Sequence, residues 1–251
     1  MNTTLLRTVT ALGMLAIAIP AYLYLPLIGV QILFVLLGYM LFYEGYSITG
    51  VPYPSLLPVV SLLLIFLAYK YLVIFAAMVY LSWFGRVVWM FQNSKQANKF
   101  WLLGCQQADI ALYISALLLM YSLDKYILLY VMTLIIGIDS FGYFGGRAFG
   151  KTRVCPQISP NKTLEGYSSA LLWVCVVMGI IMILRDIPIL NLTLSMVVVY
   201  ILATTGDLLV SYQKRVLNVK DSSSLLPGHG GFLDRFDSWM LVIPFVYLIL
   251  K

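Results

Sequence analysis

The feature that most constrains this chain is a series of nine apolar runs separated by short polar connections. Of its 251 residues, 62% are hydrophobic and only 10% are charged, and the mean hydropathy is +0.95. A helix needs about 20 apolar residues to cross a bilayer. The pattern therefore predicts an all-α, polytopic integral membrane protein with about nine transmembrane helices. The predicted spans are 5–24, 26–43, 55–69, 71–91, 102–123, 126–145, 164–184, 193–214 and 237–250.

The distribution of Lys and Arg decides between two possible span counts. Only Lys70 separates the third run from the fourth, so 55–91 could instead form one helix and lower the count to eight. Lys and Arg accumulate in cytoplasmic loops, and nine spans place 12 of the 16 bases on one side. The other side then holds Lys70, Lys125, Arg185 and Lys251. Eight spans would put Arg7 outside and bury Lys70 in a helix, so we predict nine spans and a cytoplasmic N-terminus.

The polar residues divide the chain into two regions. The N-terminal region, 1–91, consists of apolar spans and is predicted to be a lipid-side scaffold. Its first run resembles a signal peptide but lacks a small-residue cleavage site, so a retained first span is predicted. The C-terminal region, 92–251, carries two predicted cytoplasmic loops, 139–165 and 206–237.

Charge and cysteine usage exclude several classes of protein. The formal net charge is +6, but the bases lie in short loops between apolar runs. This placement indicates anionic lipid headgroups as neighbours, and no nucleic acid partner is predicted. The three cysteines are widely spaced and form no CxxC pair, which argues against both a zinc site and a disulfide framework.

The first polar segment, 139–165, is rich in glycine and bases. Residues 145–152, GGRAFGKT, match the phosphate-loop pattern GxxxxGK[ST], but an apolar helical run precedes them and two prolines follow, so a P-loop fold is rejected. Glycine amides beside Arg147, Lys151 and Arg153 would still suit a polyphosphate, although these bases could serve only as topology signals. Thr163 or Asn161 could cap the following helix, with Glu165 in its first turn.

The second polar segment, 206–237, holds the only histidine, four of the ten acidic residues and four of the sixteen bases. Asp207, Ser211 and Lys214 are spaced i, i+4, i+7, so they share one helical face. The sequence PGHGG at 227–231 predicts a non-helical turn. Several carboxylates with one histidine and no cysteine suit a hard cation such as Mg²⁺. The alternative is a buried salt-bridge network, which would gain little stability for so many buried charges.

A long pattern of residues resembles a known family signature. The pattern in 206–237 is Ser211-x-x-Lys214-Arg215-x4-Lys220-Asp221-x-Ser223-x2-Leu226-Pro227-x-His229-Gly230-Gly231-x2-Asp234-Arg235-x-Asp237. It closely resembles the signature of the phosphatidate cytidylyltransferases, also called CDP-diacylglycerol synthases. Supporting matches in the C-terminal half are Asp139-Ser140, Tyr143, Gly146-Arg147, Gly150-Lys151, Ser159-Pro160, Lys162-Thr163, Glu165-Gly166 and Gly206-Asp207. The N-terminal region matches only as apolar spans and at Glu44. Asn161, where lysine is common in the family, removes one charge from the presumed phosphate loop.

The resemblance implies a reaction and assigns roles to residues. Phosphatidic acid and CTP would give CDP-diacylglycerol and pyrophosphate, with the ionised lipid phosphate attacking the α-phosphorus of CTP. Asp207 and Asp234 would hold Mg²⁺, with Asp237, Asp139 and Asp221 as weaker candidates; a second metal or a monovalent cation is left open. The catalytic set is then Asp207, Lys214, Arg215, Lys220, Asp221, His229, Asp234, Arg235 and Asp237. The set that would bind the substrate phosphates is Asp139, Ser140, Arg147, Lys151, Ser159, Lys162, Thr163, Glu165, Ser211, Gly230 and Gly231, of which Arg147, Lys151 and Lys162 would hold the triphosphate.

The resemblance also implies a location and partners. The protein would lie in a bacterial cytoplasmic membrane with its site facing the cytoplasm, because CTP arrives from water and phosphatidic acid from the leaflet. We expect an opening between helices toward lipid, and the sequence leaves a homodimer open. Rival functions are a related CTP-dependent transferase or kinase acting on an ether lipid or polyprenol, and a secondary transporter, which would be expected to show two related halves.

Overall fold

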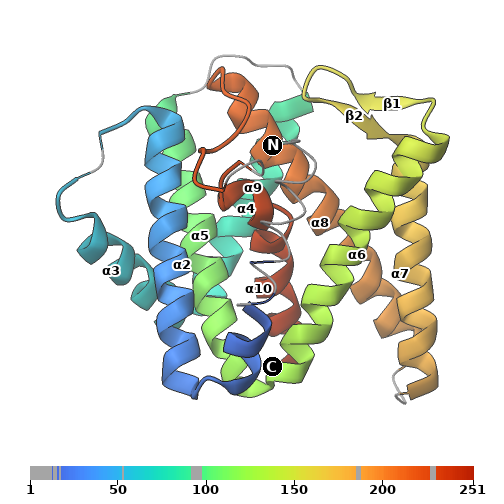
Figure 1. Ribbon diagram of the computed structural model, residues 1–251, viewed down its shortest axis with the longest axis horizontal. Helices are drawn as coiled ribbons and strands as arrows, with labels where there is room; N and C mark the ends of the chain where they lie inside the picture. Colours follow the sequence, from blue (N-terminus) through green and yellow to red (C-terminus); the bar gives the residue numbers. More distant parts are fainter. Residues whose placement is uncertain are drawn as a thin grey trace.

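The structure is a computed structural model that describes residues 13, 16, 18–52, 54–91, 98–184, 188–226 and 230–251. In these ranges the chain forms nine labelled helices and one β-hairpin (Figure 1). The helices are α2 (Leu27–Thr49), α3 (Leu57–Lys70), α4 (Leu72–Phe91), α5 (Lys99–Leu123), α6 (Lys125–Phe149), α7 (Leu164–Leu184), α8 (Ile189–Val216), α9 (Leu233–Phe236) and α10 (Trp239–Leu250).

Six of the described helices are long and apolar enough to cross a membrane: α2, α4, α5, α6, α7 and α8. Their length and composition confirm an integral membrane protein built from α-helices. The 14 residues of α3 and the 12 of α10 are too few to span a bilayer as straight helices. Most of the predicted span 5–24 lies outside the described residues, so the count of nine and the side of the N-terminus stay predictions.

The alternative of one continuous helix over 55–91 is wrong. Helix α3 ends at Lys70, and Tyr71 has φ −115° and ψ 38°, outside the helical region, before α4 begins at Leu72. The break places Lys70 in the last turn of α3, where a cation is favoured by the negative end of the helix dipole. A short helix, α3, followed by the span-length helix α4 therefore replaces one long helix in this part of the chain.

Helix α5 lies at the centre of the bundle. In its most apolar window 72% of residues are buried, against 17–33% in the other candidate spans. It packs against α2, α3, α4, α6 and α10, and its middle turns contribute fully buried residues such as Tyr113 and Ile114 to the main core. Its neighbours expose apolar side chains outward, as expected for helices that face lipid.

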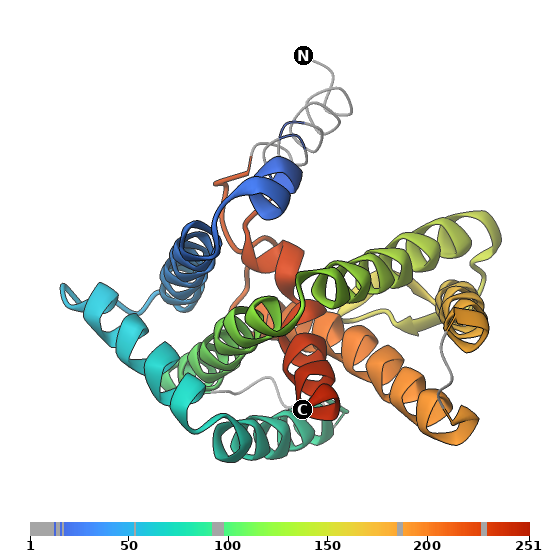
Figure 2. The ribbon, with the colours of Figure 1, turned by 90° about the horizontal axis from the view of Figure 1, so that it is seen from below.

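The polar connections gather at one end of the molecule. The hairpin between α6 and α7 and the segment 217–232 between α8 and α9 lie at the top of Figure 1, whereas the C-terminus and the α5–α6 connection lie at the opposite end. Seen from below, α6 and α8 diverge from the centre with the hairpin between them (Figure 2). The hairpin, β1 (Arg153–Cys155) antiparallel to β2 (Ser159–Thr163), is a small departure from the all-α expectation.

Both predicted loops begin inside helices, which extend a few residues beyond the ends of the predicted spans 126–145 and 193–214. Residues 139–149 belong to α6 and residues 206–216 to α8. The glycines in the α6 part serve helix packing, because α6 and α7 approach too closely for side chains. A Cβ at Gly145 would lie 2.0 Å from Ser169 Oγ, and one at Gly166 would lie 2.6 Å from the Gly142 carbonyl oxygen. The glycine amides inside α6 are therefore part of a helix and do not form a phosphate-binding loop.

Arg86 also differs from its predicted place among the cytoplasmic bases. It lies within α4 and is only 2% exposed. Its Nη1 and Nη2 donate to Oδ2 and Oδ1 of Asp109 on α5 at 2.6 and 2.8 Å. The cation thus joins two helices inside the bundle and does not face the water.

Candidate active site

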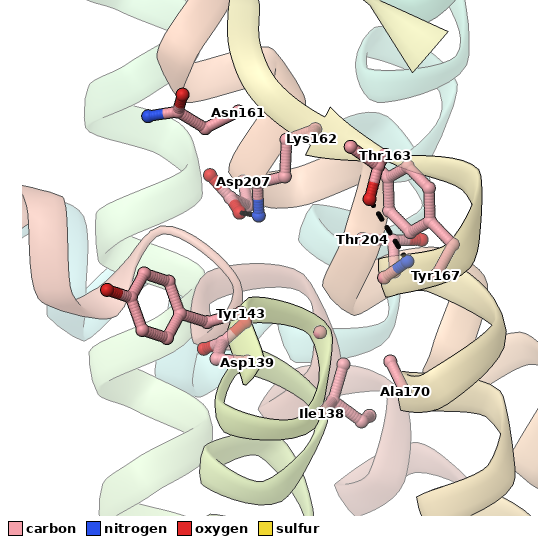
Figure 3. A pocket seen from close by; sticks show the side chains of 12 residues that line it. Ile138, Asp139, Tyr143, Asn161, Lys162, Thr163, Tyr167, Ala170, Thr204 and Asp207 are labelled. Atoms are coloured by element: carbon pink, nitrogen blue, oxygen red, sulfur yellow. Dashed lines mark hydrogen bonds and ion pairs between the residues drawn. The ribbon is translucent and has the colours of Figure 1, made fainter. Parts of the chain in front are cut away.

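A cavity of about 110 Å³ lies where α6, α7, α8 and β2 meet (Figure 3). Its floor is apolar, formed by Ile138 and Ala170, and its rim carries acidic, basic and hydroxyl side chains. The polar lining residues are Asp139, Tyr143, Asn161, Lys162, Thr163, Tyr167, Thr204 and Asp207. Both predicted polar segments therefore contribute to one site, because β2 packs against α8 near Asp207.

Lys162 and Asp207 form an ion pair at this cavity. Nζ of Lys162 on β2 contacts Oδ2 of Asp207 on α8, and Ser211, one turn further along α8, donates to Oδ1 of Asp207 at 3.4 Å. Burial alone would lower the pKa of Lys162, but the charge and hydrogen bond of Asp207 outweigh it, and the pKa is raised. The lysine is therefore a permanent cation, and with 35% of its side chain exposed it can reach a ligand.

Two further carboxylates lie beside this pair. Asp139, on α6, accepts a hydrogen bond at 3.0 Å from the hydroxyl of Ser238, which is fully buried. Asp237, between α9 and α10, accepts one at 2.8 Å from the Ser238 amide. Burial raises the pKa of Asp237 well above its ordinary value, and the charges of Asp207 and Asp139 raise it further. Negative charge is thus concentrated where α6, α8 and the start of α10 meet.

Asp234 belongs to a separate network. Its Oδ1 accepts a hydrogen bond from Lys214 Nζ at 2.6 Å, and the two side chains are 9% and 10% exposed. Its Oδ2 accepts from the Ser222 amide at 2.8 Å, the Ser222 hydroxyl at 2.9 Å and the Gly231 amide at 3.0 Å. Although burial opposes it, Lys214 together with these donors keeps the pKa of Asp234 below its ordinary value. Asp234 therefore holds the end of α8 to the segment before α9.

Several predicted site residues have structural contacts in the hairpin region. Thr163 Oγ1 accepts from the Gly166 amide at 3.2 Å, which confirms Thr163 as the residue that caps α7. Glu165 accepts from the amides of Lys151 and Thr152 at 3.0 and 3.2 Å and so fixes the start of the hairpin. Ser159 begins β2, where it pairs with Cys155.

The remaining predicted site residues lie around the cavity and differ in how far their side chains are exposed. Arg215 donates to the carbonyls of Ile158 and Val219 at 3.1 and 3.3 Å, so its guanidinium links the hairpin to segment 217–232. Arg147 donates to Tyr143 at 3.2 Å and is exposed at the end of α6. Lys151, Lys220, Asp221 and Arg235 are exposed, Ser140 is partly buried, and His229 lies outside the described residues.

The predicted turn at 227–231 is seen at its two ends. The Leu226 amide donates to the Gly230 carbonyl at 2.9 Å, closing a loop across residues outside the described part. Gly230 has φ +83°, a conformation that glycine adopts without strain. A Cβ on Gly231 would lie 1.9 Å from Ser222 Oγ, so only glycine fits there.

Comparison with known proteins identifies the family. Residues 5–251 match the cytidylyltransferase family. The chain belongs to the cytidylyltransferase family. It is similar to a protein named phosphatidate cytidylyltransferase from Bacillus subtilis (strain 168), with 33% identity over 65% of this chain and 76% of that protein. A protein of the same name from Haemophilus influenzae is 35% identical over 65% of this chain and 64% of its own length. The corresponding Staphylococcus saprophyticus protein is 44% identical over 45% of this chain and 44% of its own length. As a family member the chain is a nucleotidyltransferase.

The donor set of this cytidylyltransferase fits a hard cation. Among the described residues no three acidic, histidine or cysteine side chains converge closely enough to form a ready-made metal site. Carboxylate oxygens are nevertheless the donors that Mg²⁺ prefers, and Asp237 lies close enough to Asp207 and Asp139 for their charges to add to the effect of burial in raising its pKa. In contrast, both oxygens of Asp234 already accept hydrogen bonds.

One residue of the cytidylyltransferase site lies in the predicted scaffold. Glu44 on α2 is fully buried, and its carboxylate accepts hydrogen bonds from segment 222–233. The only sequence signals were a match to the family signature and an acidic residue near the end of an apolar run. Because burying a carboxylate inside a membrane protein is costly, Glu44 is a candidate functional residue.

Proposed function

We propose that this protein is a CTP:phosphatidate cytidylyltransferase of phospholipid biosynthesis, which converts phosphatidic acid and CTP into CDP-diacylglycerol and pyrophosphate. The observation that carries the proposal is the ion pair of Lys162 with Asp207 beside Asp139 at a cavity between membrane helices, with Asp237 close enough to interact electrostatically with both aspartates. Relatives that bear the name phosphatidate cytidylyltransferase support the choice of substrates. Membership in a cytidylyltransferase family favours nucleotidyl transfer over transport.

The chemistry requires little from the protein beyond positioning and charge neutralisation. An oxygen of the lipid phosphate forms a bond to the α-phosphorus of CTP, and the bond from that phosphorus to the oxygen bridging to the β-phosphate breaks. Pyrophosphate leaves with the bonding electrons. The nucleophile is already ionised near neutral pH, so no general base is needed. Catalysis then depends on holding the reactants in line and on cations beside the developing charge.

The exposures of the lysines suggest how the cations divide this work. Lys162 is 35% exposed at the cavity and is the better placed to contact a substrate phosphate. Lys214 is 10% exposed and bound to Asp234, so it acts mainly on the geometry of the segment before α9. Arg147 and Lys151, exposed at the same end, are available to the triphosphate.

We propose that Mg²⁺ is the metal and that Asp207 and Asp237 hold it, with Asp139 beside them. When bound, the ion would neutralise the phosphate oxygens and orient CTP for in-line attack. Asp234 is the weaker ligand of the predicted pair, because a metal would have to compete with Lys214, Ser222 and Gly231 for its oxygens. Its role as a ligand therefore requires a rearrangement of segment 217–232 on substrate binding.

The placement of the bases supports a site on the cytoplasmic side. The hairpin, the end of α8 and segment 217–226 lie at one end of the bundle (Figure 1) and carry five of the sixteen bases, Arg153, Lys162, Lys214, Arg215 and Lys220. Lys125 and Lys251 belong to the opposite end. Since Lys and Arg favour the cytoplasm, the cavity would open to CTP from that side and to phosphatidic acid from the leaflet.

Transfer of label from CTP to lipid tests the proposal. Purified protein in vesicles containing phosphatidic acid is given CTP labelled at the α- or the γ-phosphorus, with Mg²⁺ or with EDTA. We expect α-label in the lipid, γ-label in pyrophosphate, and no transfer in EDTA. Transfer of γ-label to lipid would mean a kinase, and transfer only with an ether lipid or polyprenol phosphate would mean another substrate. Either result overturns the proposal, as does activity retained by Asp207→Asn.

A further inference from the structure

The N-terminal region contributes a buried carboxylate that binds the segment just before Asp234. Glu44, on α2, is 0% exposed. Its Oε1 accepts from the Ser223 hydroxyl at 2.7 Å and the Phe232 amide at 2.9 Å. Its Oε2 accepts from the Leu233 amide at 2.7 Å and the Ser222 hydroxyl at 3.1 Å. The two ends of segment 222–233 are thus bound to one side chain.

The same segment is bound from the other side by Asp234. Ser222 contacts both carboxylates, since its hydroxyl lies 3.1 Å from Glu44 and 2.9 Å from Asp234. Gly231 fits between them: a Cβ there would lie 2.6 Å from Glu44 Oε2 and 1.9 Å from Ser222 Oγ. Figure 1 shows segment 217–226 running beside the upper half of α2.

We infer that Glu44 is a positioning residue, which fixes segment 222–233 so that Asp234 faces Lys214 at the end of α8. Its carboxylate is buried beneath the segment and does not contact substrate. Charge-assisted hydrogen bonds to a carboxylate are among the stronger ones in proteins, and two of these four go to consecutive amides just ahead of Asp234. A misplacement of about 1 Å at a reacting group can reduce the rate about 100-fold. Loss of the Glu44 hydrogen bonds should therefore lower kcat. The inference rests on the proposed function only for the measurement of kcat.

A neutral isostere tests this geometry. In Glu44→Gln one oxygen becomes an NH₂ group, which cannot accept a hydrogen bond. Each Glu44 oxygen accepts a hydrogen bond from one backbone amide. In either orientation of the Gln amide, the amide of Phe232 or of Leu233 therefore loses its acceptor. The serine hydroxyls can rotate to accept from the new NH₂, but the amides cannot. The damage should therefore appear in the backbone just before Asp234.

The experiment combines kinetics with amide hydrogen exchange on the full-length protein in detergent or vesicles. We expect Glu44→Gln to lower kcat about 10- to 100-fold, with a smaller change in the KM for CTP, and to accelerate exchange in peptides covering 230–236. Thr49→Val is the matched control: its hydroxyl is buried at the same end of α2 but bonds only to Gly45 and Tyr46 within that helix. The control should keep both the rate and the exchange pattern.

Each outcome bears on the inference. Unchanged kcat in Glu44→Gln overturns it, and so does a lower kcat with normal exchange over 230–236. If Glu44→Gln fails to fold, Ser223→Ala removes a single contact to Oε1 and should give the same pattern with a smaller amplitude; no change in either readout would overturn the inference. If the wild-type protein makes no CDP-lipid, the proposed function fails, while the exchange measurement still tests the anchor.

Discussion

The Arg86–Asp109 ion pair allows a quantitative test of how this bundle carries buried charge. The pair is bidentate, at 2.6 and 2.8 Å, and its side chains are 3% and 12% exposed. Removing one partner of a buried pair leaves an uncompensated charge and costs about 3–5 kcal/mol, whereas replacing both by apolar residues is often nearly neutral. We expect Arg86→Met and Asp109→Leu each to lose about that much stability, and the double variant to recover most of it.

Thermal unfolding of the purified protein in detergent measures the effect. For a protein of this size 1 kcal/mol corresponds to about 2–4 °C in Tm. Each single variant should therefore melt about 6–20 °C below the wild type, and the double variant within about 4 °C of it. Lys99→Met, at an exposed lysine at the start of α5, is the control for loss of a positive charge and should change Tm little.

Additive losses would refute this reasoning. If the double variant melts below both single variants, the two charges do not stabilise one another, and the pair is maintained for another reason. The pair lines a small cavity together with Gly206 and Asp237, so a functional coupling to the site would be the next explanation. Rates of CDP-lipid synthesis in the double variant would then separate a stability role from a catalytic one.

Three further predictions follow from named contacts. Lys162→Met should lower kcat/KM about 10²–10³-fold by removing a cation beside the phosphates, measured as initial rates, whereas Lys99→Met should keep the wild-type rate. Gly166→Ala should lower Tm because its Cβ would lie 2.6 Å from the Gly142 carbonyl, whereas Gly179→Ala on the same helix meets nothing within 4 Å and should raise Tm slightly; equal shifts would contradict close α6–α7 packing. Burial alone would raise the pKa of Asp234, but Lys214 together with the backbone donors outweighs it and the pKa is lowered. The ionised Asp234 therefore stabilises the fold above the ordinary carboxyl pKa of about 4, and this stabilisation is lost as pH falls through the lowered pKa. Tm should fall with acid more steeply in the wild type than in Asp234→Asn.

Periodicity and composition predicted the parts of the fold that depend on local sequence. Helix α7 has the predicted bounds, 164–184, because a long apolar run between a capping threonine and a charged connection leaves few alternatives. The shared face of Asp207, Ser211 and Lys214 lies in α8 as expected from their spacing. The joint contribution of 139–165 and 206–237 to one cavity followed from the topology, since both segments were placed on one side of the membrane.

Contacts across long sequence separations could not be predicted in this way. Glu44 lies 178–189 residues from its hydrogen-bond donors, and no pattern in an apolar run specifies such partners. Arg86 could equally have been a topology signal, because a lone base near the end of a span has the same appearance whether it faces water or a buried aspartate. The glycines of α6 were ambiguous for a related reason: glycine serves both loops and close helix packing, and only the distance to α7 distinguishes the two uses.

The carboxylates around this site separate into two groups by what their oxygens contact. Glu44 and Asp234 have oxygens that already accept hydrogen bonds from backbone amides and hydroxyls, and these bonds define the shape of segment 222–233. Among the described contacts, Asp139, Asp207 and Asp237 have fewer donors; Asp139 and Asp207 line the cavity, and their charges add to burial in raising the pKa of Asp237. A carboxylate whose oxygens already accept several hydrogen bonds can fix a backbone but has little capacity left for a cation. Carboxylates that lie close together with few hydrogen-bond donors are stabilised when a cation binds between them. The carboxylates with oxygens left for a cation therefore lie at or beside the cavity where we propose that a metal-bound triphosphate binds, whereas Glu44 and Asp234 maintain the geometry around it.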